Sequence, residues 1–307
     1  LGGYVMAAYT WTLDAGSGSD DHLVIISSNG EIAVYRGSDP SSSTDWSVIG
    51  VFTMGRPLGR RCAVKFGGDL AVNTYEGVYP LGKGLLSSSV DRRVALTDKI
   101  QNSVSQAAST LGANFGWQVC LNADDNMLIL NVPYGGGANY QYAQNTITGA
   151  WTVFSGWDAQ VWLKASTGLY YGGSTFVNKA WTGNADIAVP ITADVCQSFG
   201  YFGTKAYNKY FTMIRPYLMS GGSPSILYAL NTDYELTEPT GALSYTAPTG
   251  MVWGSMVWGS MVWGGGLEPI RAWNTVGAVA NSAAIRLKVL NGGAEFRFTN
   301  TDFLYQK

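Results

Sequence analysis

Short strand-like runs, each closed by turn-forming residues, follow one another along most of this chain. The segments His22–Ser27, Glu31–Arg36 and Met127–Val132 are typical, and Gly, Asn or Asp occurs in almost every connection between such runs. These residues favour the tight turns of hairpins. The pair Asn29-Gly30 predicts a type I′ turn, which needs positive φ at both central positions. The pattern therefore restricts the chain to an antiparallel, all-β fold.

The order of these runs repeats along the first part of the chain. Two strands followed by Trp46 return roughly 100 residues later as two strands followed by Trp151. Leu70, in the next hairpin, corresponds in the same way to Leu169. Each copy holds enough strands for about two blades of roughly 40–50 residues. The repeat predicts a β-propeller-like domain over residues 1–185, because a propeller leaves only short sheet edges exposed. A pair of packed sandwiches is the alternative.

One helix is expected to interrupt this β pattern, within an insertion at about residues 87–112. Thr97 is the expected N-cap residue and Gly112 the expected C′ residue. Apolar side chains at spacings near four, as an amphipathic helix requires, occur within Asp98–Leu111 at Ile100, Val104, Ala107, Ala108 and Leu111.

A second, β-rich segment is expected at residues 186–307, after a boundary near Gly183–Pro190. Its last strands alternate clearly. Ile285, Leu287 and Val289 share one face of a strand, and Arg286 and Lys288 share the other. The strands are expected at Ile191–Phe199, Tyr210–Met219, Ile226–Leu230, Ile270–Val276, Ala284–Leu290 and Ala294–Thr299.

A five-residue unit with the sequence Met-Val-Trp-Gly-Ser begins at Met251 and recurs in the loop 251–264. A period of five matches neither a strand face nor a helix face. Indoles and thioethers are costly to leave in water. We therefore expect a neighbouring subunit, or the C-terminal sheet of this chain, to cover them. The expected interface residues are Met251, Trp253, Met256, Trp258, Met261 and Trp263.

The low charge of the chain favours assembly over nucleic-acid binding. Charged residues make up 13% of the chain, against about 25% in a typical globular protein. A charge-poor, aromatic-rich surface suits a subunit that buries much of it against partners. The formal net charge of −2 creates no field that would attract nucleic acid. No stretch holds the roughly 20 apolar residues of a membrane-spanning helix. The chain begins without Met or a signal peptide, so a truncated first element is expected.

No catalytic, cofactor-binding or metal-binding set of residues emerges from the sequence. His22 is the only histidine, and its acidic neighbours favour a solvated loop position. Cys62, Cys120 and Cys196 are far apart and are expected to be buried free thiols. Residues 145–151 were compared with the turn motif of sialidases, and only one Gly and one Trp of that motif are present. An enzyme is therefore not expected.

The basic doublets of the chain are Arg60-Arg61 and Arg92-Arg93. They are either solvated charges at the ends of strands and helices, or charges that line a DNA channel or form ion pairs between subunits. The many aromatic residues either pack between blades or bind glycans, because aromatic rings serve both purposes.

Four stretches in the last third of the chain carry a family resemblance. They are Phe199–Gly203, Lys209–Pro216, Arg271–Gly277 and Thr299–Tyr305, and the Trp-containing loop 251–264 lies among them. In these stretches the chain resembles tail proteins of short-tailed bacteriophages, of the nozzle or packaged-DNA-stabilisation type. Relatives carry Asp in each five-residue unit where this chain has Gly.

The resemblance implies a non-enzymatic structural subunit of the virion, assembled in the host cytoplasm. Such subunits usually form a homo-hexameric ring that stacks below the portal and adaptor proteins, and DNA leaves through this ring. The resemblance thus implies contacts with other tail proteins, passage of DNA without sequence-specific binding, and no cofactor. The alternative function is a carbohydrate-binding β-propeller, either lectin-like or a tail module that binds a host receptor.

Overall fold

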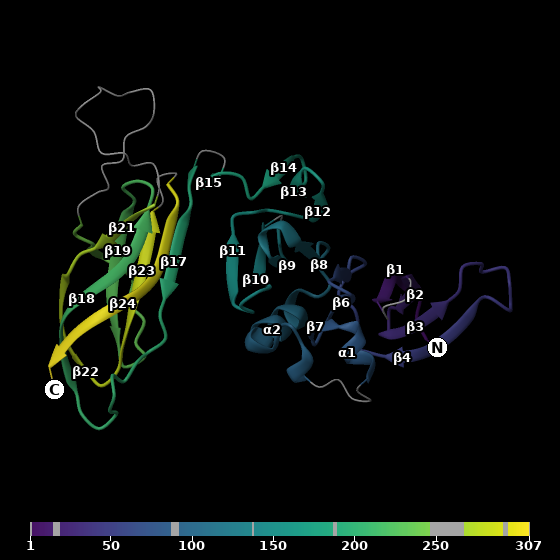
Figure 1. The fold of residues 1–307 in the computed structure, drawn as a ribbon, viewed down its shortest axis with the longest axis horizontal. Coiled ribbons are helices and arrows are strands. Elements are labelled where there is room, and N and C mark those ends of the chain that lie inside the picture. The colour runs from purple at the N-terminus through teal and green to yellow at the C-terminus, as the bar shows by residue number, and fades with distance from the viewer. Residues whose placement is uncertain are drawn as a thin grey trace. The chain divides into compact units, whose positions relative to one another are not determined.

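The computed structural model describes residues 2–14, 19–86, 92–136, 138–186, 189–245, 267–290 and 294–306. The chain divides into two compact units, unit 1 at Leu1–Trp181 and unit 2 at Thr182–Lys307 (Figure 1). This division lies just before Gly183–Pro190, where the sequence placed a boundary. Strands dominate both units, so the fold is all-β as predicted. In the described ranges, no helix is both long and apolar enough to cross a membrane.

Unit 1 is propeller-like: small antiparallel sheets, here called blades 1 to 4, follow one another along the chain (Figure 1). Blade 1 consists of β1 (Val5–Asp14), β2 (Ser19–Ser27), β3 (Glu31–Arg36) and β4 (Ser47–Thr53). Blade 2 consists of β5 (Ala63–Phe66), β6 (Asp69–Thr74) and β7 (Gly77–Pro80). Blade 3 consists of β8 (Gln118–Asn122), β9 (Met127–Gly135), β10 (Ala138–Asn145) and β11 (Trp151–Ser155). Blade 4 consists of β12 (Val161–Ala165), β13 (Gly168–Gly172) and β14 (Val177–Ala180).

The repeat predicted from the sequence is present in these blades. A four-stranded blade followed by a three-stranded blade occurs twice. Trp46 directly precedes the last strand of blade 1, and Trp151 begins the last strand of blade 3. Leu70 and Leu169 are the second residues of the middle strands β6 and β13, and they are 1% and 2% exposed. Equivalent residues therefore hold equivalent places in the two halves of unit 1.

Buried apolar clusters join each blade to the next. The clusters include Ile32 and Val72 for blades 1 and 2, Val78 and Leu130 for blades 2 and 3, and Ile129 and Leu169 for blades 3 and 4. Within the described ranges, no such cluster joins blade 4 to blade 1. The two middle blades are thus packed on both faces, and each end blade on one.

The predicted helical insertion lies between blades 2 and 3. It contains α1 (Leu81–Leu86), η1 (Arg92–Val94), η2 (Asp98–Ile100) and α2 (Gln101–Leu111). Thr97 and Gly112 occupy cap positions, of η2 and α2, but neither caps its helix in the way that was predicted. The Thr97 side chain caps no helix and instead accepts a hydrogen bond from the Val78 backbone N–H at 3.2 Å, which ties the insertion to β7. Gly112 has a right-handed φ of −59°, so it is not the left-handed C′ residue that was expected.

Three further local expectations are wrong. Only Gly30 of the Asn29-Gly30 pair has positive φ (88°), and the turn is a three-residue connection rather than type I′. His22 is not in a loop but lies buried in β2, with its ring centroid 6.0 Å from that of Trp11. Cys62 and Cys120 are buried as expected, whereas Cys196 is exposed. The register explains the exposed thiol: Cys196 pairs with Arg286, and register partners share a face of the sheet, which here is the outward one.

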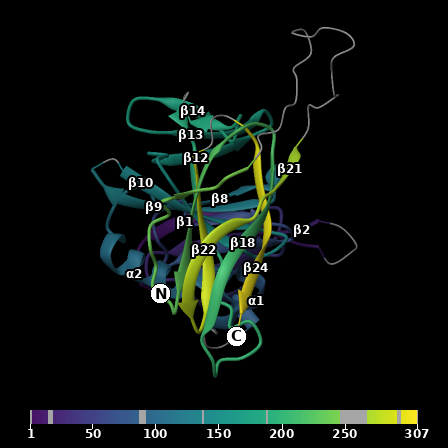
Figure 2. The same ribbon diagram turned by 90° about the vertical axis from the view of Figure 1, so that its left-hand side faces the viewer.

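Unit 2 is built from two antiparallel sheets and a short hairpin. The sheet that contains the C-terminal strand faces the viewer in Figure 2. The hairpin pairs β15 (Ala185–Asp186) with β16 (Val189–Pro190). The first sheet has the order β17 (Thr192–Cys196), β23 (Ala283–Leu290), β19 (Ser225–Thr232) and β20 (Gly241–Ala242). The second sheet is centred on β18 (Lys209–Ser220). It is flanked on one edge by β24 (Phe296–Gln306) and on the other by β22 (Asn274–Ala280) and β21 (Glu268–Arg271).

The two sheets of unit 2 form a sandwich with a shared core. Ile214 and Leu218 of β18 belong to the same buried cluster as Ile285, Leu287 and Val289 of β23. The alternation predicted for β23 is therefore confirmed: its apolar residues face the core and its charged residues face outward.

Candidate functional site

The loop 251–264, with the predicted interface residues Met251, Trp253, Met256, Trp258, Met261 and Trp263, lies outside the described residues. Of the basic doublets, Arg60 and Arg93 are exposed, and Arg92 lies in η1.

Arg61 is engaged within unit 1. Its Nη2 donates to the Gln160 carbonyl at 2.9 Å, and its guanidinium lies 5.2 Å from the ring centroid of Phe115. The predicted role of the doublets in a channel or at an interface stays a prediction.

A charged and aromatic cluster occupies the outward face of the β18 sheet. Arg215 on β18 lies over the ring of Tyr217 at 5.1 Å and over the ring of Trp273 at 4.7 Å. Its Nη2 lies 2.6 Å from the Asp302 carboxylate on β24, which also accepts from the Tyr217 hydroxyl at 2.9 Å. These hydrogen bonds, first from Arg215 and then from Tyr217, hold the pKa of Asp302 below its ordinary value. The guanidinium is thereby fixed in one orientation.

Exposed apolar side chains surround this charged cluster. Tyr210 and Val279 are register partners on β18 and β22, and both are exposed. Leu304 on β24 and Trp273 are exposed as well. We call these residues together with Arg215, Tyr217 and Asp302 the β18 face. Apolar and aromatic side chains around an arginine are the composition that protein interfaces favour.

Directly beneath the β18 face, aromatic residues fix the sheet from inside. Phe211 is fully buried and lies 5.2 Å from the ring of Phe202. Phe202 also lies 4.8 Å from Phe303 and 5.5 Å from Tyr305, whose hydroxyl donates to the Phe202 carbonyl at 3.2 Å. This packing connects the segment before β18 with β18 and β24.

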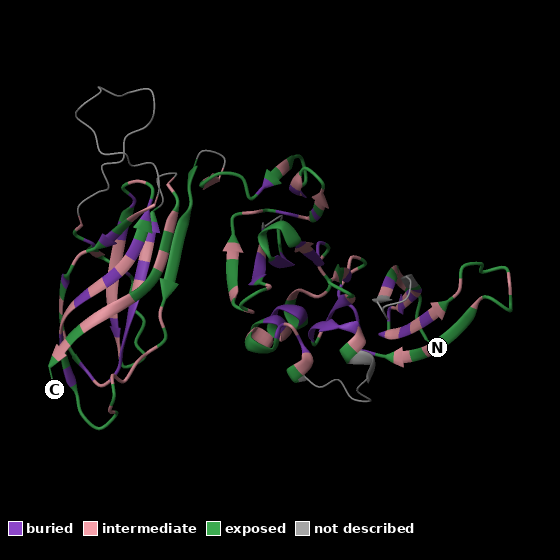
Figure 3. Cartoon of the chain, in the orientation of Figure 1, coloured by how far each residue is buried: buried purple, intermediate pink, exposed green. Residues whose placement is uncertain are grey.

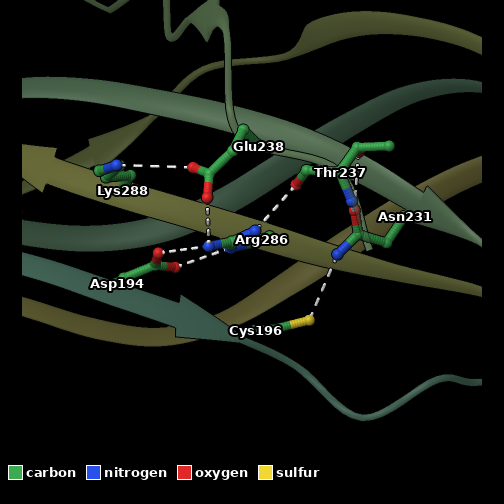
Figure 4. Close-up of polar contacts among 7 residues, drawn as sticks. All are labelled: Asp194, Cys196, Asn231, Thr237, Glu238, Arg286 and Lys288. Carbon is green, nitrogen blue, oxygen red and sulfur yellow. Dashed lines mark hydrogen bonds and ion pairs between the residues drawn. The ribbon is translucent and has the colours of Figure 1, made fainter. Parts of the chain in front are cut away.

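On the other sheet of unit 2, a polar network centred on Arg286 fixes β17 to β23 (Figure 4). Arg286 binds the Asp194 carboxylate through Nε at 2.9 Å and Nη2 at 2.6 Å. It also donates to Glu238 Oε1 at 3.1 Å, and Lys288 Nζ lies 3.5 Å from the other oxygen of Glu238. The hydrogen bonds from Arg286 lower the pKa of Asp194. Every charge in this network has a partner of opposite sign, which is the pattern of a structural site.

Unit 1 carries a hollow of about 330 Å³ between α2 and blade 3. Tyrosines form one wall: the rings of Tyr134 and Tyr140 lie 6.4 Å apart, and Tyr140 and Tyr142 meet edge to face at 5.3 Å. Ring faces with hydroxyl and amide groups opposite them match the apolar and polar sides of a sugar. The lining residues are Ser103, Gln106, Ala107, Thr110, Leu111, Tyr134, Tyr140 and Tyr142.

Reactive groups are few in the described part of the chain. Burial raises the pKa of Cys62 to about 11 and that of Cys120 to about 11, so both thiols stay protonated and unreactive near neutral pH. Among the described residues, no group of three or more His, Cys, Asp or Glu side chains is placed to hold a metal ion.

Sequence reasoning assigned no role to Arg215, Trp273, Asp302 or the tyrosines of the hollow. Arg215 and Asp302 are 87 positions apart, and no local pattern indicates such a contact. The closely spaced Tyr134, Tyr140 and Tyr142 and the helix were both visible in the sequence, but the packing of α2 beside these tyrosines is a tertiary contact that no local pattern indicates.

No protein-family model and no curated protein matches this chain. Among solved structures, it is similar to a glycoside hydrolase family 43 arabinoxylan arabinofuranohydrolase from Bacillus subtilis in complex with cellotetraose. The identity is 10% and the TM-score 0.30, over 98% of this chain and 79% of that chain. Because that protein is a hydrolase, the sequence-based expectation that this chain is not an enzyme is withdrawn. At this TM-score the likeness assigns no substrate and no site to the chain.

Proposed function

We propose that this chain is a structural subunit of the tail of a short-tailed bacteriophage. In this proposal its copies form a homo-hexameric nozzle or tube ring, stacked below the portal and adaptor proteins, through which DNA leaves the virion. The proposal rests on the family resemblance in unit 2 and on the surfaces described above.

The observation that carries the proposal is that the stretches bearing the resemblance pack on one another. Lys209–Pro216 lies in β18, Thr299–Tyr305 lies in β24, and these strands pair with each other. Arg271–Gly277 spans the end of β21 and the start of β22, which both pair with β18. Phe199–Gly203 supplies Phe202 to the aromatic packing beneath them. The resemblance therefore follows one folded sheet rather than scattered residues.

The β18 face supports the same proposal. It combines exposed Tyr210, Val279 and Leu304 with a fixed Arg215–Asp302 pair. A ring subunit needs such surfaces, because apolar side chains exposed in one chain become the buried centre of a contact between chains.

The native mass of the purified chain tests the proposal. A hexamer of the 32.9 kDa chain, seen as a ring with a central opening by electron microscopy, is the expected result. Tyr210→Ser and Val279→Ser should together weaken the ring, whereas Ile147→Ser, on an exposed turn of unit 1, should not. A chain that stays monomeric at high concentration contradicts the proposal.

The tyrosine-lined hollow favours a second candidate function, a carbohydrate-binding tail module. A sugar stacked on Tyr134 would lie opposite Gln106 and Thr110, which offer an amide and a hydroxyl for hydrogen bonds. Calorimetric titration with a panel of plant and bacterial oligosaccharides tests this function. Tyr134→Ala should abolish any binding, and Tyr207→Ala, an exposed tyrosine of unit 2, should leave it unchanged. Absence of binding across the panel removes this candidate.

A further inference from the structure

In the described part of unit 1, each end blade has one sheet face against which no other blade packs. The free face of blade 4 carries Leu163, Tyr170 and Val177. Along the strands of this blade, buried residues lie among intermediate and exposed ones (Figure 3). Leu163 is 63% exposed and Val177 is 75% exposed. The opposite face of the same blade carries the buried Leu169 and packs on blade 3. Blade 4 is therefore apolar on both faces, like a middle blade.

The repeat shows what the free face of blade 4 corresponds to in blade 2. Tyr170 directly follows Leu169, and Ala71 directly follows the equivalent Leu70, so Tyr170 and Ala71 are equivalent. Their register partners, Leu163 in blade 4 and Val64 in blade 2, are therefore equivalent as well.

By the same alignment Gly172 is equivalent to Asn73. Their register partners, Val177 in blade 4 and Val78 in blade 2, are then equivalent too. In blade 2 these positions are covered: Val78 is fully buried, and Val64 packs against the cluster shared with blade 3. The exposed Leu163 and Val177 are thus the counterparts of residues that form the contact between blades 2 and 3.

The free face of blade 1 corresponds to a covered face of blade 3. Tyr35 pairs with Val48 and Tyr142 pairs with Val153, and each valine lies two residues after the equivalent Trp46 or Trp151. Leu23 pairs with Tyr35 on blade 1 as Leu130 pairs with Tyr142 on blade 3. Leu130 is fully buried in the cluster shared with blade 2 and α2, and Tyr142 is buried there too. Leu23 and Tyr35 are only partly buried. The free face of blade 1 therefore matches the blade 3 side of the contact between blades 2 and 3, and the free face of blade 4 matches the blade 2 side.

We propose that blade 4 of one copy of this chain packs against the free face of blade 1 of a second copy, and so reproduces between chains the contact that joins blades 2 and 3 within the chain. Both halves of the contact are present on every chain, which is why the second copy is the partner that fits. Charges on the two faces are of opposite sign, with Asp21 and Glu31 on blade 1 and Lys179 on blade 4. This inference rests on the proposed function, in which copies of the chain form a ring.

Such a contact is head-to-tail, because two different surfaces meet. A head-to-tail contact continues from copy to copy until the rotation closes a ring. It also makes a specific prediction for mixed variants, because a chain that has lost one face still has the other.

The test uses the full chain with one face disabled at a time. The blade 4 variant is Leu163→Glu with Val177→Glu, and the blade 1 variant is Val51→Glu, the exposed register partner of Ala33. All three positions are exposed, so the variants keep their cores. Ile147→Glu, on an exposed turn, is the matched control. Particle mass is measured by sedimentation, alone and after mixing.

The wild type and the control should assemble, and each face variant alone should be monomeric. An equimolar mixture of the two face variants should form a two-chain particle, because one intact contact remains. The inference is overturned if the blade 4 variant assembles as fully as the wild type, or if mixing restores nothing. If the ring forms with both variants, this contact is contradicted but the proposed tail function is not. If the wild type is monomeric, both the contact and the proposed tail function are contradicted.

Discussion

At the scale of single residues, unit 2 is ordered by polar side chains whose hydrogen bonds are satisfied within the chain. Lys209 is fully buried, and its Nζ donates to the carbonyls of Thr204, Tyr207 and Asn281 at 2.6, 3.0 and 3.1 Å. One ammonium group thus joins the segment before β18 to the turn between β22 and β23. A buried cation is tolerated here because every one of its protons has an acceptor.

Lys209→Met should test this arrangement, because it keeps the length of the side chain and removes the donors. Each buried carbonyl left without a partner costs about 1–3 kcal/mol. The free energy of unfolding should therefore fall by at least the cost of one such carbonyl. Urea denaturation measures the change. Lys205→Met is the control, since Lys205 lies over the ring of the partly exposed Tyr201. Equal effects of the two substitutions contradict the assignment.

The Arg286–Asp194 pair predicts a dependence of stability on pH. Because the folded pKa of Asp194 is lowered, its contribution is complete above the ordinary aspartate pKa of about 3.9 and is lost as the pH falls through the lower folded value. The carboxylate is partly exposed, so screening limits the contribution to at most about 1 kcal/mol. The stability difference between wild type and Asp194→Asn should be constant from pH 5 to 7 and vanish in acid. A difference that grows in acid argues against the pair.

At the scale of elements, alternation and turn residues were sufficient to place most of the strands, although β1 was not predicted and the strand expected at Ile270–Val276 is divided between β21 and β22. β3 has the predicted bounds, and the predicted strands at residues 127–132 and 284–290 lie within β9 and β23. Period-two patterns are local, so the sequence displays them directly. The Thr97 cap and the turn at Asn29 failed for another reason: tertiary contacts with β7 and the geometry of a three-residue connection override local preference.

The contact between blades 3 and 4 contains a polar element that the sequence could not reveal. The Asn131 amide nitrogen donates to the carbonyls of Gly116 and Ala159 at 2.8 and 2.9 Å. Its oxygen accepts from Gln141 Nε2 at 2.9 Å and from Trp162 Nε1 at 3.0 Å. A single asparagine in an apolar strand looks like a defect in the pattern until the strands around it are known.

Asn131→Ala should destabilise unit 1 more than an ordinary truncation, since it leaves four buried polar groups without that partner. We expect a loss of about 2–4 kcal/mol in the free energy of unfolding, given about 1–3 kcal/mol for each unsatisfied group and some relaxation. Thermal or urea unfolding followed by tryptophan fluorescence reports the change. Asn178→Ala, whose amide makes a 3.3 Å bond to Tyr171, is the matched comparison. A loss no larger than that of the comparison contradicts the assigned role.

At the scale of the whole molecule, each unit has its own core and its own candidate surfaces. The candidate surfaces could be foreseen only in part. The resemblance indicated the segments of unit 2 that prove to be adjacent strands, but the Arg215–Trp273–Asp302 cluster depends on contacts between distant segments. The free faces of the end blades depend on which faces the other blades cover, which requires the fold.

Separate cores predict separate unfolding transitions in calorimetry. Leu169→Ala, in the core of unit 1, should lower one transition midpoint and leave the other in place. Phe211→Ala, in the core of unit 2, should do the reverse. Large-to-small core substitutions cost about 2–5 kcal/mol, which is enough to separate the transitions. If both substitutions shift a single transition equally, the units unfold together.

The uneven exposure of the three thiols has a practical consequence. With Cys62 and Cys120 sealed in the blades, a maleimide dye should attach once to the native chain, at Cys196 on β17. Intact-mass spectrometry should show one adduct before unfolding and three after it. That single addressable position would turn strand β17 into a fluorescent reporter without any engineered cysteine.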